Sequence, residues 1–226
     1  MDDTEKQFPA TPMKILGRHR AHRTHPAGGW SLLEMAVVMA IGIIMSTVTV
    51  LSLQPVWKNN AVNNAYDEVL MALRNARQSA VNERRVYLVT FDTTDNTKFT
   101  VQRMLAGNNG APDPNGLTQY TLPRGLQFLN MSGIPNVSAQ TPDNLGVGGL
   151  PVHFDMNVAG GNRYQIYFEP DGSARDVNMN INNGLAYIAD GKDLYSSRAI
   201  SLMGAAGRIR GWRLIPNGAQ GQWLQQ

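Results

Sequence analysis

The segment PAGGWSLLEMAVVMAIGIIMSTVTVLSLQP, from Pro26 to Pro55, holds a single charged side chain, Glu34, at the head of a long apolar run. The 19 residues from Met35 to Leu53 carry no charge, and as an α-helix they would be about 28 Å long. That length matches the hydrocarbon core of a bilayer, so we predict a transmembrane helix. A charge costs about 2.5–3.5 kcal/mol at the bilayer centre, so an acid retained beside this run is expected to be functional.

Two simpler alternatives exist for this segment: a plain signal anchor and an unusually long signal peptide. The run is long for the apolar core of a signal peptide, and no clear small-x-small cleavage site ends it. Neither alternative accounts for Glu34, nor for the pair Gly28-Gly29 immediately before the run.

The charges before the apolar run predict its orientation. Between residues 14 and 23 there are four cations and no acid: Lys14, Arg18, Arg20 and Arg23. Because basic flanks stay on the cytoplasmic side, this end is expected in the cytoplasm and the C-terminal part on the opposite side. Several prolines and little apolar periodicity predict that residues 1–29 are disordered.

Composition limits the classes of protein to consider. A chain of 226 residues, 42% hydrophobic, suits one globular domain plus an appendage. It has no cysteine, which excludes disulfides and thiolate metal sites but leaves the redox compartment open. A formal net charge of +3 is too small to indicate an electrostatic partner by itself.

The hydrophobic pattern becomes amphipathic after Pro55. Apolar residues recur at spacings of three and four, which is the stripe of a helix with one buried face: Val62, Tyr66, Val69, Leu73, Ala76 and Ala80. We predict one long helix, with residues 30–55 in the membrane and residues 56–84 packed against a soluble domain. Proline removes an intrahelical hydrogen bond, so a kink is expected at Pro55.

Residues 85–226 carry short β signals. Residues 85–92 and 98–105 flank TTDNT like the arms of a hairpin, and residues 163–178 form a second hairpin around a Pro-Asp-Gly turn. A glycine- and proline-rich loop is expected at residues 106–116. Further strands are predicted at residues 117–122, 184–190, 197–203 and 207–215. The predicted fold class is α+β, an N-terminal helix packed on antiparallel strands.

The stretch GG-WSLLEMAVVMAIGIIM resembles the class III signal of type IV prepilins and type II secretion pseudopilins. In that family a basic leader ends in glycine, followed by an aromatic residue, a small polar residue, two aliphatic residues and glutamate. The resemblance implies that a prepilin peptidase cleaves between Gly29 and Trp30, removes residues 1–29 and methylates the new N-terminus at Trp30. Trp30 departs from the family, where phenylalanine or methionine is usual.

The same resemblance implies an assembly role for Glu34, the fifth residue of the mature chain. Cleavage creates a positive α-amine on Trp30 at membrane depth, and a buried charge is tolerable when it is paired. In pilin-like filaments the glutamate of one subunit neutralises the amine of its neighbour. The alternative is an acid that only stabilises the helix start, where the macrodipole contributes about 0.3–1 kcal/mol.

The C-terminal half carries a second resemblance. YQIYFEPDGSARD followed by RAISLMGAAGRIRGWRL resembles the end of the GspH/FimT group of minor pseudopilins, with residues that match in order: Phe168, Pro170, Gly172, Arg198, Gly207, Arg208 and Arg210. This implies a pilin-like, single-pass protein of the inner membrane, with residues 85–226 as a periplasmic domain. The implied partners are other pseudopilins or pilins, a prepilin peptidase and the membrane.

Nothing in the sequence indicates catalysis. His153 is the only histidine after residue 29, and it lies in GLPVHFDM, residues 149–156, which is expected to form a strand with no nucleophile motif nearby. The pairs Asp92/Asp95 and Asp190/Asp193 could suggest calcium, but neither has the spacing of a dedicated loop, and aspartate is also a common turn residue. We expect no enzyme activity, no cofactor and no metal.

Two functions remain. One is a minor pseudopilin near the tip of the type II secretion pseudopilus, which supports protein export across the outer membrane. The other is a FimT-like minor type IV pilin that binds DNA for uptake through Arg208, Arg210 and Arg213. Five of the 20 basic and three of the 17 acidic residues precede Trp30, which leaves 15 against 14. This near neutrality favours the first function.

Strand alternation separates these two functions further. It predicts Arg208, Arg210 and Trp212 on one face of the last predicted strand, with Ile209 and Gly211 on the other. An exposed arginine face would favour DNA binding, whereas arginines paired with turns or carboxylates would be structural. We favour the structural outcome.

Overall fold

The structure is a computed structural model that describes residues 29–105, 110–135, 138–145, 149–156, 162–218 and 220–226; of residues 51–59 and 220 it describes the backbone alone. The predicted leader therefore lies outside the described residues, apart from Gly29. Two units can be distinguished, residues 1–49 and residues 50–226, and each is described by itself.

Helix α1 begins at Leu32 and ends at Glu83. Its first part, Leu32–Val50, is 19 residues long with a mean hydropathy of 2.1, so it is long and apolar enough to cross a membrane. The helix is continuous at Pro55, and the predicted kink there stays a prediction.

The second part of α1 packs through the predicted stripe. All six residues of the stripe are buried: Val62, Tyr66, Val69, Leu73, Ala76 and Ala80. The neighbouring polar positions Asn64, Asp67, Glu68 and Arg74 are exposed, so the amphipathic prediction is confirmed.

The first sheet has five antiparallel strands in the order β3-β2-β1-β6-β7. Their bounds are Tyr87–Phe91 for β1, Lys98–Met104 for β2, Pro112–Thr121 for β3, Gln165–Phe168 for β6 and Ala174–Arg175 for β7. Both predicted hairpins are confirmed, as β1–β2 and β6–β7.

One prediction in this sheet is wrong. Residues 112–116, expected in a loop, form the first half of β3. Strand β3 lies at the edge of the sheet, where proline is tolerated because half of the backbone N–H groups need no partner strand. Proline content alone could not distinguish an edge strand from a loop.

The second sheet is also antiparallel, with the order β11-β10-β9-β8-β4, and β5 also pairs with β8. Its strands are β4 (Gln127–Phe128), β5 (Val152–His153), β8 (Gly184–Ala189), β9 (Arg198–Met203), β10 (Arg208–Asn217) and β11 (Gln220–Gln225). Four of these, β5, β8, β9 and β10, were expected, whereas β4 and β11 were not. The α+β class and the antiparallel pairing are confirmed.

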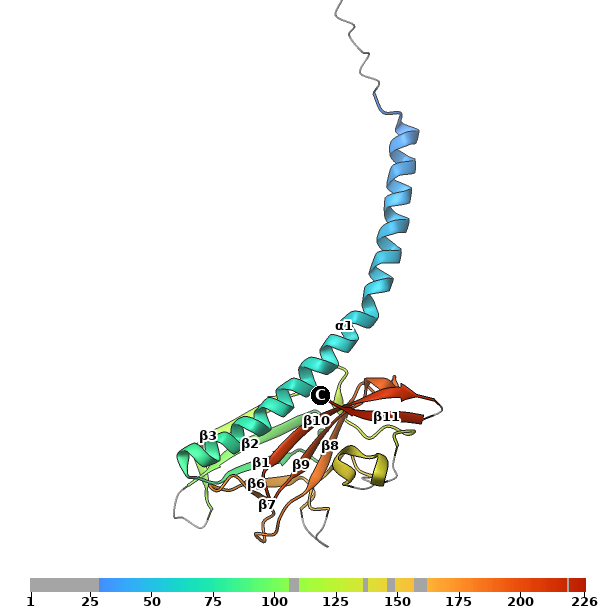
Figure 1. Cartoon of the computed structure of the whole chain (residues 1–226). Coiled ribbons are helices and arrows are strands. Elements are labelled where there is room, and N and C mark those ends of the chain that lie inside the picture. Colours follow the sequence, from blue (N-terminus) through green and yellow to red (C-terminus); the bar gives the residue numbers. More distant parts are fainter. Residues whose placement is uncertain (1–28, 106–109, 136–137, 146–148, 157–161, 219) are drawn as a thin grey trace, which may run out of the picture. The chain divides into compact units, whose positions relative to one another are not determined.

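The main core lies between the second part of α1 and both sheets (Figure 1). It joins Leu73 of the helix to Phe91 and Phe99 of the first sheet and to Ile200 and Ile209 of the second. The Phe91 and Phe99 rings stack with their centroids 5.7 Å apart. Burying such side chains stabilises the fold by about 1.5–3 kcal/mol each.

A smaller core covers the opposite face of the second sheet. Leu185 and Tyr187 of β8 pack there with Leu214 and Trp223 of β10 and β11. The covering segment includes two short 3-10 helices, η1 (Ser138–Gln140) and η2 (Pro142–Asn144). Strand β8 is therefore buried at every position, which explains why its sequence does not alternate between apolar and polar residues.

Candidate functional site

The predicted cleavage site lies immediately before α1. Trp30 is 67% exposed, and a Cβ added at Gly29 would meet nothing within 4 Å. No packing among the described residues therefore requires glycine at position 29. The described part of the fold therefore does not explain why residue 29 is a glycine.

Ser31 caps the helix, with its Oγ accepting a hydrogen bond from the backbone N–H of Leu33 at 3.2 Å. Glu34 lies three residues after this cap, in the first turn of α1, which is the spacing of a capping box. Its side chain is exposed. The pattern Ser-x-x-Glu, from Ser31 to Glu34, is the sequence signal of such a cap.

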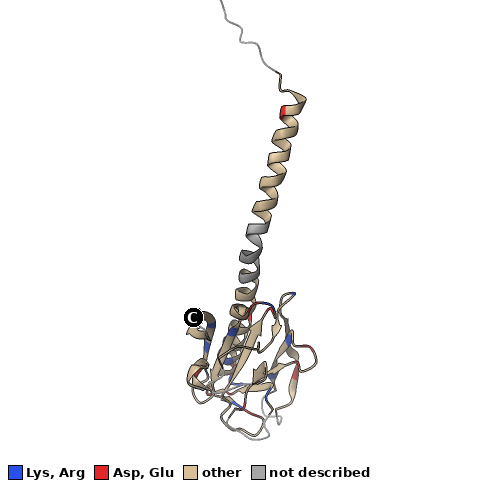
Figure 2. Cartoon of the chain, turned by 90° about the vertical axis from the view of Figure 1, so that its right-hand side faces the viewer, with Lys and Arg blue, Asp and Glu red and all other residues tan. Residues whose placement is uncertain are grey.

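The helix after Glu34 presents an apolar surface to its surroundings. None of the span Leu32–Val50 is buried, and Figure 2 shows no charged residue in this part after the first turn. Hydroxyl groups within it are satisfied by the helix itself: Ser46, Thr47 and Thr49 donate to the carbonyl oxygens four residues earlier at 2.7–2.9 Å. Lipid offers no hydrogen bonds to such groups, so this is the arrangement that a membrane span requires.

The arginines of β10 lie on two different faces. Ile209 and Gly211 are buried toward the helix, Arg208 is exposed, and Arg210 and Trp212 are half-buried, so the predicted alternation is confirmed. Arg213 follows the alternation of Ile209 and lies on the helix side of the sheet. The three candidate DNA-binding residues therefore do not form one surface.

A carboxylate pairs with the first two arginines. The Oδ1 atom of Asp143, in η2, accepts hydrogen bonds from Arg210 Nη1 at 2.8 Å and from Arg208 Nη2 at 3.5 Å. The side chain of Asp143 is only 5% exposed. Its other oxygen accepts from the hydroxyl of Ser201, which in turn accepts from Trp212 Nε1 at 2.9 Å.

We name Asp143, Ser201, Arg208, Arg210 and Trp212 the arginine face. Sequence reasoning missed Asp143, because it lies more than 60 residues from its arginine partners and inside an ordinary Pro-Asp-Asn turn. The contact with a carboxylate is the one expected if the arginines are structural. DNA binding by these residues stays a prediction.

Arg198, which begins β9, cannot be a surface contact. It is fully buried, and its guanidinium donates to Asn63 Oδ1 at 2.8 and 3.2 Å and to the carbonyl oxygens of Tyr195, Ser196 and Ser197. Arg198 therefore links the helix, the second sheet and η3 (Leu194–Ser196). The sequence placed this arginine on a strand but did not indicate its burial.

His153 lies half-buried on β5 with no catalytic arrangement around it among the described residues. Burial, and then the charge of Arg163, lower its pKa below the usual value. The Nδ1 atom is buried without a hydrogen-bond partner. A half-buried histidine, with no described neighbour to orient it as a base, fits a packing role.

The two aspartate pairs act in turns. Asp92 Oδ1 accepts from the backbone N–H groups of Thr94 and Asp95, and Asp190 Oδ1 accepts from those of Lys192 and Asp193. Within the described part of the chain, no group of three or more His, Asp or Glu side chains is placed to hold a metal ion.

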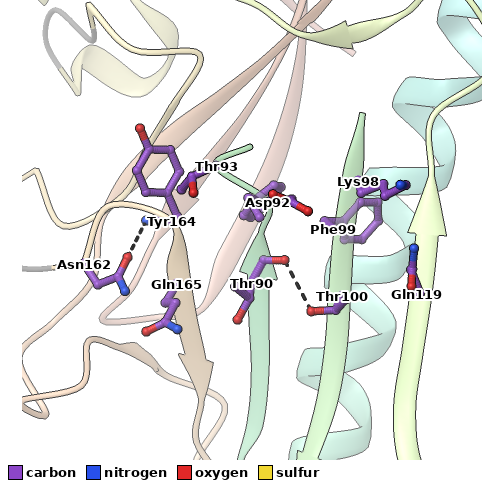
Figure 3. Close-up of a pocket in the computed structure, with 11 residues that line it drawn as sticks. Thr90, Asp92, Thr93, Lys98, Phe99, Thr100, Gln119, Asn162, Tyr164 and Gln165 are labelled. Atoms are coloured by element: carbon purple, nitrogen blue, oxygen red, sulfur yellow. Dashed lines mark hydrogen bonds between the residues drawn. The ribbon is translucent and has the colours of Figure 1, made fainter. Parts of the chain in front are cut away.

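A cavity of about 330 Å³ lies on the first sheet, and Figure 3 shows its residues with α1 behind the strands. Register places Gln119, Thr100, Thr90 and Gln165 in one row across four strands. The charged Lys98 at its edge is paired with Asp95 at 2.8 Å. Neutral polar side chains on an open sheet face are expected wherever a sheet meets water, and we attach no function to this cavity.

No protein-family model and no curated protein matches the chain. Among solved structures, it is similar to two crystal structures of the type IV minor pilin FimU from Pseudomonas aeruginosa. One has a TM-score of 0.40 at 16% identity and covers 72% of this chain and 92% of that chain. The other has a TM-score of 0.38 at 16% identity, with 70% and 95% covered. Similarity this distant does not assign a function to this chain.

Proposed function

We propose that the protein is a minor subunit of a pilin-like filament, a GspH/FimT-type pseudopilin of type II secretion that acts near the filament tip. The observation that carries the proposal is the apolar span Leu32–Val50, unburied along its whole length and headed by the Gly29–Glu34 motif. A surface of this kind needs a covering of lipid or of other apolar helices. A filament subunit uses both, first in the inner membrane and then in the filament.

Four residues of the motif have distinct roles in this mechanism: Gly29, Trp30, Ser31 and Glu34. Prepilin peptidase cleaves after Gly29, and the α-amine of Trp30 is methylated and remains positively charged. Ser31 holds the first turn of the helix, so the carboxylate of Glu34 lies one turn from the new N-terminus. In a filament this carboxylate pairs with the amine of the neighbouring subunit, since an unpaired charge in an apolar environment is costly.

Localisation and partners follow from this role. The span anchors the chain in the inner membrane, and residues 85–226 form the periplasmic domain. Its partners are the other pseudopilins and the peptidase, and its work in export is mechanical, without an enzyme activity, metal or cofactor of its own.

Processing is the first test. Co-expression with a prepilin peptidase is expected to shorten the chain by residues 1–29 and to leave N-methylated Trp30, as read by mass spectrometry. Gly29→Ala is expected to slow or stop cleavage without disturbing the fold, because the added methyl group meets nothing. Gly42→Ala is the matched control, since it also adds a methyl group in open space and lies outside the motif. An intact leader in functional membranes would contradict the proposal.

Two substitutions of Glu34 separate pairing from capping. Pairing needs the negative charge, so Glu34→Ala and Glu34→Gln are both expected to impair filament incorporation while insertion and cleavage continue. Capping needs only a hydrogen-bond acceptor, so under that alternative Glu34→Gln would assemble normally. Crosslinking between subunits measures incorporation. Undiminished crosslinks in Glu34→Gln would contradict pairing, whether or not Glu34→Ala also assembles.

A second candidate, a DNA-binding minor pilin of a type IV pilus, is favoured by one observation: the side chain of Arg208 is 46% exposed. Its electrostatic free energy would scale with the number of phosphates neutralised. Asp143 already offsets one of the two charges on that face, and Arg213 lies on the other face, so the filament role is the better supported.

A further inference from the structure

A cavity of about 720 Å³ opens beside β10 and β11, next to the arginine face. This volume is within the range of small-ligand pockets, about 300–1,000 Å³. Its walls include Arg208, Arg210, Trp212, Gln222 and Trp223, and Asp143, whose side chain is only 5% exposed, also lines it. The cavity lies on the face of the second sheet that α1 does not cover, as the strand alternation requires.

The charges in this cavity do not cancel. Arg208 and Arg210 are its cations, and Asp143 is the one acid among the residues that line it. Each guanidinium carries five N–H donors, and each donates one of them to Asp143. The cavity is therefore left with one net positive charge and an excess of hydrogen-bond donors.

The arginines are positioned before any ligand arrives. Asp143 is held from its far side by Ser201, and Ser201 is held by the indole N–H of Trp212. Arg210 is thereby anchored at one end of its guanidinium while remaining one-third exposed. A donor fixed in this way loses less conformational entropy on binding than a free surface arginine.

We propose that this cavity binds a carboxylate carried by an acidic segment of a partner protein, and that Arg210 and Arg208 donate the hydrogen bonds to it. Arginine donates to carboxylates through a planar fork of N–H groups, and the indoles of Trp212 and Trp223 supply apolar walls for the rest of the segment. This rests on the proposed function only in that a filament subunit has protein neighbours.

Duplex DNA fits the cavity less well. Non-specific DNA binding gains affinity with each phosphate that a cation neutralises, and this face offers one net charge. Arg213, the next arginine on the strand, is turned to the other face and cannot extend the row. A recess with two donors suits one inserted side chain better than a continuous phosphate backbone.

The test uses the full chain in detergent micelles and a fluorescein-labelled tetraglutamate peptide, with binding read by polarisation at low salt. Arg208→Gln and Arg210→Gln are each expected to weaken binding by roughly tenfold or more, since hydrogen bonds between charged groups contribute about 1.5–3 kcal/mol. Asp143→Asn is expected to tighten binding, because the amide oxygen can still accept from Arg210 while the net charge of the cavity rises by one. Arg213→Gln, an exposed arginine on the same strand, is the matched control and is expected to bind like the parent chain.

Several results would overturn the proposal. One is that the folded parent chain does not bind the peptide, and another is that Arg213→Gln weakens binding as much as Arg208→Gln and Arg210→Gln do. A third is that citrate or inorganic phosphate competes as well as unlabelled peptide, which would indicate a small-anion site. Tighter binding of a short duplex DNA, lost in the Arg208/Arg210 double variant, would assign the face to nucleic acid. Melting temperatures identify any variant that unfolds. If Arg210→Gln unfolds, Arg208→Gln still tests the proposal, because the side chain of Arg208 is exposed and its replacement is expected to leave the fold intact. Peptide binding needs neither peptidase nor filament, so its failure leaves the cleavage and assembly tests intact.

Discussion

At the scale of single residues, Arg198 shows how a buried charge is accommodated by hydrogen bonds to neutral acceptors. Burial, and then the charge of Arg213, lower its pKa to about 10, and neutral oxygens accept its hydrogen bonds. Leaving a charged group without a partner in such a place costs more than the hydrogen bond contributes when it is made. Asn63, on the helix, is therefore expected to contribute to stability by accepting hydrogen bonds from Arg198.

Replacing Asn63 tests this link. Asn63→Ala removes the acceptor of two hydrogen bonds from the buried guanidinium, and is expected to lower the free energy of unfolding by about 1.5–3 kcal/mol. Denaturant unfolding of the full chain in detergent measures the change. Asn64→Ala is the control, because its side chain is exposed, and it is expected to change stability by less than about 0.5 kcal/mol. Equal losses in the two variants would show that Arg198 does not depend on Asn63.

At the scale of elements, the approach of α1 to β10 depends on one glycine. A Cβ at Gly211 would lie 1.4 Å from the hydroxyl oxygen of Tyr66, so the strand and the helix can approach this closely only without a side chain there. Tyr66 is part of the buried stripe and cannot move away freely. The alternation of β10 thus serves two purposes, a close helix contact on one face and the arginines on the other.

Gly211→Ala is expected to destabilise the domain by about 1–3 kcal/mol, as overpacking of a close-packed interior does. A lower melting temperature of the full chain would report it. Gly149→Ala adds the same methyl group at an exposed position with nothing within 4 Å, and is expected to leave the melting temperature unchanged. A stable Gly211→Ala chain would mean that Tyr66 adopts another rotamer at little cost.

At the scale of the whole molecule, the chain combines two kinds of surface. Residues 50–226 form a unit with buried cores on both sides of its second sheet, whereas the span Leu32–Val50 buries none of its apolar surface. Apolar surface in water is unfavourable by about 25 cal/mol per Å². The two units therefore require different surroundings.

Membrane anchoring can be tested with one charge. Ile43→Arg places a cation in the span at a cost of about 2.5–3.5 kcal/mol, and is expected to move the chain out of the alkali-resistant membrane fraction. Met71→Arg is the control. Met71 is 62% exposed and Ile43 is 68% exposed, so the two positions are similarly accessible. Met71, however, lies in the part of α1 that packs on the sheets and outside the span. Retention of both variants in the membrane would argue against Leu32–Val50 as the span.

Local patterns were enough to determine much of this protein. The long apolar run, the stripe that begins at Val62, and both hairpins follow from the period of side chains along a helix or strand and from turn residues, so neighbours in sequence suffice to predict them. The alternation of Arg208 and Ile209 was predictable for the same reason. The motif from Gly29 to Glu34 is likewise a run of consecutive residues, so it can be recognised without the fold.

Only the tertiary structure decided which side chains meet across the fold. Arg210 and Asp143 are 67 residues apart, and Arg198 and Asn63 are 135 residues apart, and no local pattern brings either pair together. Strand β11 and the first half of β3 contain glycine, glutamine or proline, which are not typical strand residues, so the sequence alone does not predict these strands. They are recognised by their pairing with β10 and β2. Such contacts depend on the path of the whole backbone, because a buried charge or an edge strand is satisfied by whichever partner the fold places beside it.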